Sequence, residues 1–379
     1  MGMASMNSSP ARPLSPRDRY LALVTGAAMA FGLLEGYHRI GLKGEDAALG
    51  PDTKATQAMF RGRRLNAWQP ADFEAVWLGT PGNASVDADV LWLGNSQLHS
   101  INQFKTGHEV APCYASIAAA RPVVGLSLPN ANLQELLVVF AWAISHRKPR
   151  AAMIGVFYDD LREDGLRAGL EALDSRATRA LLERSAAGRI ICRELDRLQQ
   201  SKSDIQGTTD NEDSYQDRSE AALNAWLAER WHLWRDRDQM YAALQVKHLY
   251  RLRNWVFGIT PQSVRPMIPV RAEKNMAALD ALMDLARKSG VRLLVYVPPL
   301  RNDIAPPYDM AAYGEWQRLL RIRCIDAGAL FANYGDLVPA HCWGLHGGAI
   351  DFMHFQNEGH RLLGAAVVKD LDLVAPPAD

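Results

Sequence analysis

Short apolar runs rich in β-branched residues alternate with helical segments along most of this chain, and this alternation limits the folds open to it. The runs that we expect to form strands are 90–93, 122–126, 151–157, 291–297 and 329–331. The helices that we expect between or after them are 133–145, 272–289, 313–327 and 356–371. Strands that are buried on both faces read as continuous apolar runs, which is typical of parallel sheets covered by helices. The sequence therefore predicts an α/β domain over 90–379 whose parallel sheet has about five strands.

A long insertion interrupts this pattern between the third and fourth strands, at 161–270. Residues 165–198 have an amphipathic helical pattern, whereas 199–219 is polar and acidic and is predicted to be a mobile loop. The stretch 221–257 is helical again and carries tryptophans among arginines and histidines: Trp226, Trp231, Trp234 and Trp255. It is a candidate for a lid, for a docking surface for a membrane partner, for a face lying on lipid, or for a helical subdomain whose tryptophans pack on the sheet. Residues 38–89 are predicted to be a linker and N-terminal extension.

The N-terminus has the pattern of a targeting segment. Residues 1–19 are mostly polar and include several arginines, and 20–34 is an uncharged run that ends at Glu35. Positive charge before an apolar run keeps the N-terminus inside the cell. We therefore interpret 1–19 as a cytoplasmic tail and 20–37 as a signal anchor or a signal peptide.

Three alternatives follow for 20–37. An uncleaved anchor makes the protein a single-pass cell-membrane protein with its body in the periplasm. Cleavage at a small-x-small site such as Ala28-Met29-Ala30 gives a secreted periplasmic form. The third alternative is a buried N-terminal helix of a soluble protein, because the run is short for a membrane span, which needs about 17–25 residues.

Charge and cysteine content narrow the function further. Lysine plus arginine number 42, as do aspartate plus glutamate, and this balance argues against a nucleic-acid partner. Four cysteines without C-x-x-C spacing do not suggest a zinc site. Two alternatives fit them: a disulfide between Cys324 and Cys342, or buried free thiols. We expect no cofactor.

The strongest chemical signal joins two distant segments. The strand at 90–93 ends in Gly94-Asn95-Ser96, and Asp351-x-x-His354 precedes the last helix. Ser96 follows an expected strand, and His354 is expected in a loop before the last helix. Both positions lie at the carboxyl edge of the sheet, where α/β proteins bind ligands. A serine, a histidine and an aspartate that orients the histidine are the parts of a nucleophilic centre. Two other interpretations of Asp351 and His354 are a helix-capping pair and, together with His360, a metal site, although no H-x-x-x-H or H-E-x-x-H pattern is present.

These two motifs resemble the first and last blocks of the SGNH, or GDSL-like, hydrolase superfamily. The wider phrase from Gly94 to Asn102 resembles its membrane-anchored cell-envelope branch, which includes alginate O-acetyltransferases and D-alanyl-lipoteichoic-acid transfer proteins. The resemblance implies a flavodoxin-like three-layer fold, with Ser96 as nucleophile, His354 as base and Asp351 as the group that orients it. It covers about 90–160 and 291–371, but not the helical insertion.

The resemblance also implies an oxyanion hole, which this chain matches only in part. The second block corresponds to 127–132, where Asn130 stands in place of the expected glycine and offers a backbone N–H. The third block corresponds to Gly155–Asp160 and lacks the expected asparagine. The candidates for the missing donor or for substrate binding are Asn95, Asn132, Tyr158 and Arg301.

The sequence thus favours an extracytoplasmic serine acyl-ester enzyme. The resemblance favours O-acetyl transfer to a cell-envelope or secreted polysaccharide, with hydrolysis to acetate as the variant in which water takes the acyl group. A membrane-bound acyl-transfer protein is an expected partner. The alternative is a non-catalytic adaptor of the same fold that binds glycan or docks such a partner, because the third-block asparagine is missing.

Overall fold

The computed structural model describes residues 15–41, 58–79, 90–99, 109–210, 215–235, 237, 252, 255–257, 263–264, 266–346 and 349–374. The chain divides into two compact units. One consists of residues 1–47 and 212–258, and the other of residues 48–211 and 259–379.

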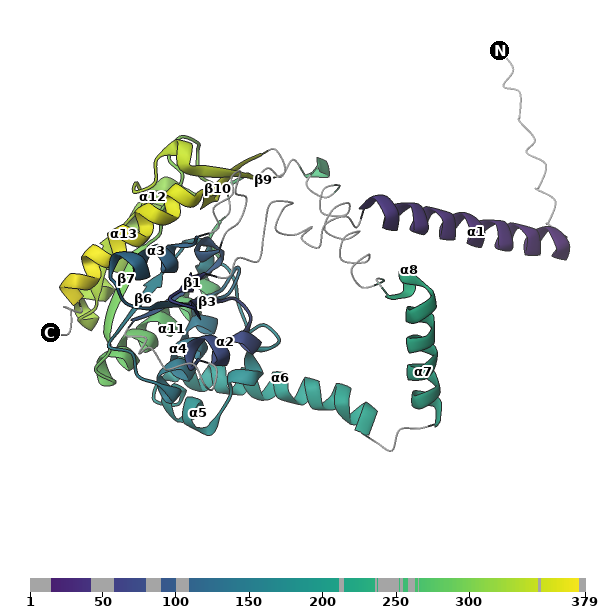
Figure 1. Ribbon diagram of the computed structural model, residues 1–379, viewed down its shortest axis with the longest axis horizontal. Coiled ribbons are helices and arrows are strands. Elements are labelled where there is room, and N and C mark those ends of the chain that lie inside the picture. The colour runs from purple at the N-terminus through teal and green to yellow at the C-terminus, as the bar shows by residue number, and fades with distance from the viewer. Residues whose placement is uncertain are drawn as a thin grey trace, which may run out of the picture. The chain divides into compact units, whose positions relative to one another are not determined.

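The larger unit is built on a six-stranded parallel sheet (Figure 1). Its strands are β3 Asn66–Ala67, β4 Val90–Gly94, β5 Val123–Ser127, β6 Ala151–Gly155, β7 Arg292–Val297 and β8 Leu330–Asn333. Their spatial order is β3-β5-β4-β6-β7-β8, with parallel pairing between all neighbours. The five strands from β5 to β8 have the flavodoxin order, in which the chain changes direction across the sheet between β4 and β6. The predicted α/β fold and its five strands are confirmed, and β3 is a short sixth strand at one edge.

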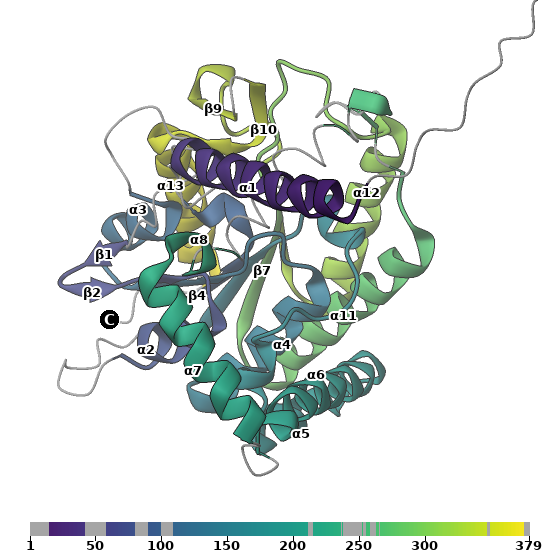
Figure 2. The same cartoon turned by 90° about the vertical axis from the view of Figure 1, so that its right-hand side faces the viewer.

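Helices cover both faces of this sheet. The helices of this unit are α2 Pro70–Trp77, α3 Ala111–Ala118, α4 Leu133–His146, α5 Arg176–Leu182, α6 Ala186–Asp210, α11 Pro269–Lys288, α12 Met310–Ala327 and α13 Asn357–Val374. Buried side chains of α3 and α13 pack against one face, and those of α2, α4, α11 and α12 pack against the other. The helices α4 and α11 lie side by side in both views (Figure 1, Figure 2).

The alternation of side chains along each strand explains why the strands read as unbroken apolar runs. In β4, Leu91 and Leu93 join the core under α4 and α11, whereas Val90 and Trp92 join the core under α3 and α13. All four side chains are buried. A strand with two buried faces has no position for a polar residue until it leaves the sheet.

Two small antiparallel hairpins lie outside the main sheet. One pairs β1 Met59–Phe60 with β2 Arg63–Arg64, and the other pairs β9 Trp343–His346 with β10 Ala349–Phe355. The second hairpin carries the Asp-x-x-His motif and leads directly into α13. In the sequence this motif was expected in a loop.

The insertion differs from its prediction in two respects. The stretch 165–198 is divided among a 3-10 helix at Leu170–Leu173, α5 and the first half of α6. Helix α6 continues to Asp210 and α7 begins at Tyr215, so most of the polar stretch 199–219 is helical and not a loop. Its acidic and polar side chains suit an exposed helix as well as a loop, and composition alone does not separate the two.

The smaller unit contains α1 Pro16–Gly41, α7 Tyr215–Arg230 and α8 His232–Arg235. Trp231 packs against the ring of Phe31 with centroids 5.4 Å apart, and His232 Nε2 lies 2.8 Å from a carboxylate oxygen of Glu35. Trp231 and Trp234 stack on each other. These two tryptophans therefore contact each other, and Trp231 also contacts the N-terminal helix.

Helix α1 spans the segment predicted to be a signal anchor or signal peptide. Several large apolar side chains on it are exposed, among them Leu23 and Leu33 at 70% and 75%. In the part of the chain that the structure describes, no helix combines the length and hydropathy required to cross a membrane.

All four cysteines are free thiols with buried side chains. The predicted disulfide between Cys324 and Cys342 is therefore wrong. Cys324 lies in α12 inside one core, and Cys342 lies in the short helix η5, Ala340–Cys342, inside the other. The two residues are on opposite sides of the sheet, and closeness in sequence misled the prediction.

Candidate active site

Ser96 stands in a tight turn where the chain leaves β4. Gly94 leaves room there for the Leu98 side chain, because a Cβ atom at this position would lie 2.7 Å from Leu98 Cδ1. Ser96 then opens the short 3-10 helix η1, Ser96–Leu98. The Asn95 side chain caps this helix, since its Oδ1 accepts from the backbone N–H of Gln97 at 3.1 Å. Strand end, glycine and cap together hold the hydroxyl at the carboxyl edge of the sheet.

Asp351 and His354 are arranged by a local turn within β10. Asp351 Oδ1 accepts from the backbone N–H groups of Met353 and His354, at 2.8 and 3.1 Å. Its other oxygen lies 2.8 Å from His354 Nδ1. The Asp-x-x-His spacing therefore lets one carboxylate order the turn and hold the imidazole.

The structure brings these three side chains together across 258 residues of sequence. His354 Nε2 lies 2.9 Å from Ser96 Oγ, so the contacts run from the serine hydroxyl through the imidazole to the carboxylate. Ser96 and Asp351 are buried, and the His354 side chain is 18% exposed. An imidazole held in this way accepts the serine proton at Nε2 while Nδ1–H donates to the carboxylate.

A cavity of about 290 Å³ opens beside Ser96. Its lining residues are Asn95, Ser96, Asn130, Ala131, Asp159, Asp160, Arg162, Glu163 and Met353. They come from the turns after β4, β5 and β6 and from β10. The cavity thus lies at the carboxyl ends of β4 and β6, where the strand order changes direction and where open α/β sheets bind ligands.

Three N–H donors face this cavity region. The backbone N–H groups of Ser96 and Asn130 donate no hydrogen bond to any residue that the structure describes. Asn130 has a left-handed backbone with φ 52°, a conformation that glycine and asparagine adopt most readily. This explains why an asparagine can stand at position 130, where the SGNH superfamily that the sequence resembles has a glycine.

The side chain of Asn95 is the third donor. Its Nδ2 gives one hydrogen to Asp160 Oδ1 at 3.1 Å, and its second hydrogen has no acceptor within the described residues. Asp160 is fully buried, and its other oxygen accepts from the backbone N–H of Phe157 at 2.9 Å. Burial raises the pKa of the Asp160 carboxyl well above its usual range, against the opposite effect of these two hydrogen bonds.

The remaining predicted residues lie outside the cavity. Asn132 caps α4 through a capping box with Glu135, and its Nδ2 donates to the carbonyl of Gly165. The Tyr158 ring packs edge-on against Tyr308 and Tyr313, and burial raises the pKa of its hydroxyl. Both residues are structural in this arrangement.

Arg301 also lies outside the cavity lining. Its guanidinium pairs with Asp303 and reaches the backbone carbonyls of Gly344 and Asp351. It therefore holds the segment behind the imidazole and does not face a substrate.

Three buried polar residues around the site were given no role from the sequence: Gln97, His99 and Asp160. His360, which the sequence offered only as a metal ligand, is buried beside them. Burial, with a smaller contribution from the neighbouring His354, lowers the pKa of both His99 and His360 to about 3. His99 Nε2 lies 3.1 Å from Ser127 Oγ at the end of β5. Proximity in sequence to Ser96 and His354 was the only available signal, and it does not distinguish packing from chemistry.

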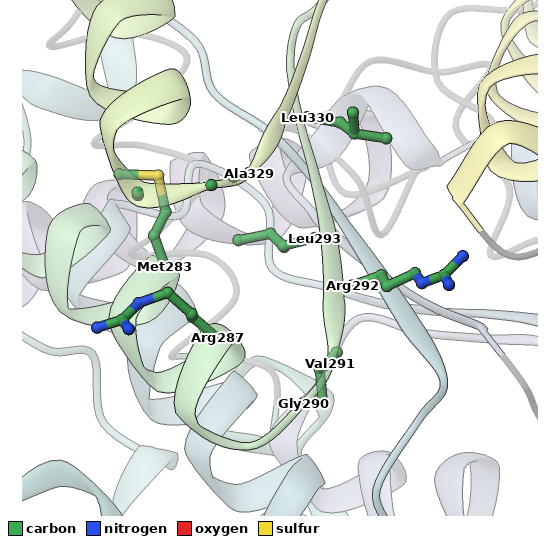
Figure 3. A pocket seen from close by; sticks show the side chains of 10 residues that line it. Met283, Arg287, Gly290, Val291, Arg292, Leu293, Ala329 and Leu330 are labelled. Carbon is green, nitrogen blue, oxygen red and sulfur yellow. The ribbon is translucent and has the colours of Figure 1, made fainter.

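A larger cavity of about 560 Å³ lies at the opposite ends of β7 and β8 (Figure 3). Figure 3 shows the side chains of Arg287 and Arg292 pointing in opposite directions, and Arg287 pairs with Asp284 at 2.5 Å. Neither a hydroxyl nor an imidazole lines this cavity. In the described chain, no group of three or more His, Cys, Asp or Glu residues is placed to hold a metal ion, and this includes the surroundings of Asp351, His354 and His360.

Comparisons with known proteins give a distant structural match. No family model and no curated protein matches the chain. A solved structure from Desulfitobacterium hafniense DCB-2, described as "a putative lipolytic protein of G-D-S-L family", aligns over 75% of this chain and 99% of its own. The two share 10% sequence identity, with a TM-score of 0.34. At this distance the site has to be interpreted from its own residues.

Proposed function

We propose that the protein is a serine acyl-ester enzyme whose nucleophile is Ser96. The observation that carries the proposal is the continuous contact from Ser96 Oγ through His354 to Asp351, beside a cavity at the carboxyl edge of the sheet. A serine hydroxyl is a weak nucleophile until a neighbouring base takes its proton, and this arrangement supplies such a base.

The reaction then proceeds in two halves. His354 takes the hydroxyl proton as Ser96 attacks the ester carbonyl, and the imidazolium returns that proton to the departing alcohol. The acyl group stays on Ser96. In the second half His354 activates either water, which gives hydrolysis, or a sugar hydroxyl, which gives transfer.

The negative charge on the tetrahedral intermediate is stabilised by three N–H groups. Two come from the backbone of Ser96 and Asn130, and the third comes from the Asn95 amide, oriented by Asp160. The amide thus replaces the donor that the resembling family supplies from its third block. Donors fixed before the reaction do not have to reorient as charge develops.

The cavity supports a short acyl group. It measures about 290 Å³, and Ala131 and Met353 are its only aliphatic lining residues, whereas acidic, amide and hydroxyl groups form most of its walls. Sites for drug-sized or lipid-like ligands are larger and mostly apolar. An acetyl ester of a hydroxyl-rich alcohol fits this composition better than a fatty-acyl ester.

The alcohol that we propose is a cell-envelope or secreted polysaccharide. The support for this proposal is the order of segments along the chain: basic residues come first, then an uncharged apolar run, and then the long remainder of the protein. This order is typical of proteins that are exported to the periplasm and held at the membrane. An acetyl donor in that compartment implies a membrane-bound acyl-transfer partner. O-acetyltransferase and esterase activities would use the same three residues, Ser96, His354 and Asp351, and differ only in whether a sugar hydroxyl or water accepts the acyl group.

Hydrolysis of 4-nitrophenyl acetate by the full-length protein tests the proposal. We expect turnover that Ser96→Ala reduces by at least about 10³-fold, because no other group can form the acyl-enzyme. Unchanged turnover in Ser96→Ala eliminates the catalytic role. No turnover in the folded wild type favours the adaptor, which a glycan-binding measurement on the same sample then examines.

A further inference from the structure

The segment that carries His354 is not part of the main sheet. Among the described residues, strand β10 pairs with β9 alone, in an antiparallel hairpin separate from the six parallel strands. Ser96, by contrast, is fixed directly to the end of β4. The distance between imidazole and hydroxyl therefore depends on whatever joins the hairpin to the sheet.

Three consecutive carbonyl oxygens of this segment accept hydrogen bonds from Gln97 and Arg301. Gln97 Nε2 donates to Met353 O at 2.9 Å, Arg301 Nη1 donates to Asp351 O at 3.3 Å, and the backbone N–H of Arg301 donates to Phe352 O at 3.4 Å. The segment of residues 351–353 is thus attached on the side opposite the one where Asp351 caps its N–H groups.

Gln97 connects three parts of the site at once. It follows Ser96 directly, and its Nε2 also donates to the carbonyl of Pro299 at 2.9 Å, just beyond β7. The side chain is buried and is absent from the lining of the Ser96 cavity. Both hydrogens of its amide are therefore used on main-chain carbonyls, one on each neighbouring segment.

We infer that Gln97, assisted by Arg301, is a positioning residue that sets the distance and angle between His354 and Ser96. The inference rests on the catalytic role proposed for these two residues. A primary amide is the only uncharged side-chain group with two N–H donors, so Gln is suited to bridging two carbonyls. Misplacing a catalytic group by about 1 Å costs on the order of 100-fold in rate.

Gln97→Met tests the inference, because methionine has a similar length and volume but no donor. We expect kcat for 4-nitrophenyl acetate to fall about 10- to 100-fold while KM stays within about twofold, since Gln97 does not line the cavity. Arg301→Met is expected to lose less, because the backbone N–H of residue 301 still reaches Phe352 O.

Gln134→Met is the matched control. Gln134 is also a buried glutamine, and its Nε2 donates to Asp164 Oδ1 at 3.2 Å, away from the residues 351–354. It should show a comparable change in melting temperature with kcat within about twofold of wild type.

Gln97→Glu supplies a readout that a merely structural role does not move. An ionised carboxylate faces two carbonyl oxygens without a donor, whereas the protonated acid restores one. The ratio of mutant to wild-type kcat should therefore rise as pH falls, and the same ratio for Gln97→Met should stay constant. If Gln97→Met does not fold, the pH dependence of the ratio of Gln97→Glu to wild-type kcat tests the positioning role by itself.

The outcomes separate the two claims. The positioning role is wrong, while the catalytic proposal stands, in three cases. Folded Gln97→Met retains wild-type kcat, or its KM rises while its kcat does not fall, or the ratio of Gln97→Glu to wild-type kcat is independent of pH. If the wild type shows no turnover that depends on Ser96, the catalytic proposal itself has failed.

Discussion

At the scale of single residues, the site depends on a pair of polar side chains that the sequence did not reveal as a pair. Asn95 and Asp160 lie 65 residues apart, yet they share a buried hydrogen bond beside Ser96. The family that the chain resembles places an asparagine in the third block. Here the third block supplies a carboxyl group instead, and the amide comes from the residue before the nucleophile.

Replacing Asn95 tests its role as the third donor. Asn95→Ser keeps an oxygen that can accept from the N–H of Gln97 but removes the amide donor. We expect kcat for 4-nitrophenyl acetate to fall by about 10²–10³, the usual effect of losing one oxyanion donor. Steady-state kinetics at constant pH measures this, and a fall below about fivefold would assign Asn95 to capping alone.

Asp351→Asn tests the orientation of the imidazole. The amide oxygen can still accept from the backbone N–H groups of Met353 and His354, so the turn should persist. The amide nitrogen favours the tautomer with the proton on Nε2, which cannot accept from Ser96. We expect kcat to fall by about 10⁴ with little change in melting temperature. A variant with near wild-type kcat would show that Asp351 only shapes the turn.

At the scale of elements, the sequence predicted what is periodic and missed what is short or built by tertiary contacts. Strands β4 to β7 were recognisable because both of their faces are buried, whereas the edge strand β8 is only partly buried and was recognised from its short apolar run. Strand β3 has two residues and pairs at the edge of the sheet, so it leaves no pattern. The end of α6 was missed because a polar, exposed helix and a polar loop have similar compositions.

The same distinction applies to the candidate site residues. Ser96, Asp351 and His354 follow from local motifs, and the structure brings them into contact. The role of Asn132 is also local, because Asn132 and Glu135 have the spacing of a capping box, although this signal was not used in the prediction from sequence. The role of Arg301 depends on the carbonyl of Asp351, which no local pattern joins to it. Chemistry that spans distant elements requires the fold to be known first.

The placement of Asn132 predicts a stability effect without a catalytic one. Its side chain accepts from the N–H of Glu135 at the start of α4, and this satisfies a donor that the helix itself leaves unpaired. Asn132→Ala should lower the free energy of unfolding by about 1 kcal/mol, with kcat within about twofold of wild type. Chemical denaturation and steady-state kinetics of the same preparation measure both. A large loss of kcat in the folded variant would instead indicate that Asn132 is an oxyanion-hole donor.

At the scale of the whole molecule, the two buried imidazoles next to the site link its folding to pH. His99 and His360 have a pKa of about 3 in the folded protein, against an ordinary value of 6.5, chiefly because burial penalises the charged form. Between these values the unfolded chain binds more protons than the folded one. The contribution of these two imidazoles to the free energy of unfolding is therefore fully present above about pH 6.5 and is lost as pH falls.

The expected slope is about 1.4 kcal/mol per pH unit for each imidazole below pH 6.5. Calorimetric melting between pH 7 and pH 4.5 should show a steady fall in melting temperature, and His360→Gln should reduce the slope relative to wild type. The Asp160 carboxyl, whose pKa is raised, contributes a slope of opposite sign in both proteins, so the comparison of the two slopes decides. Equal slopes for His360→Gln and wild type would contradict the low pKa of this imidazole.

The central claim is that His354 activates Ser96 for covalent chemistry. Mass spectrometry of the full-length protein after incubation with 4-nitrophenyl acetate and rapid acid quench tests it most directly. The account predicts one acetyl group, mapped to the peptide containing Ser96 and absent from both Ser96→Ala and His354→Ala. An acetyl group at another residue, or equal labelling of Ser96 in His354→Ala, would contradict it.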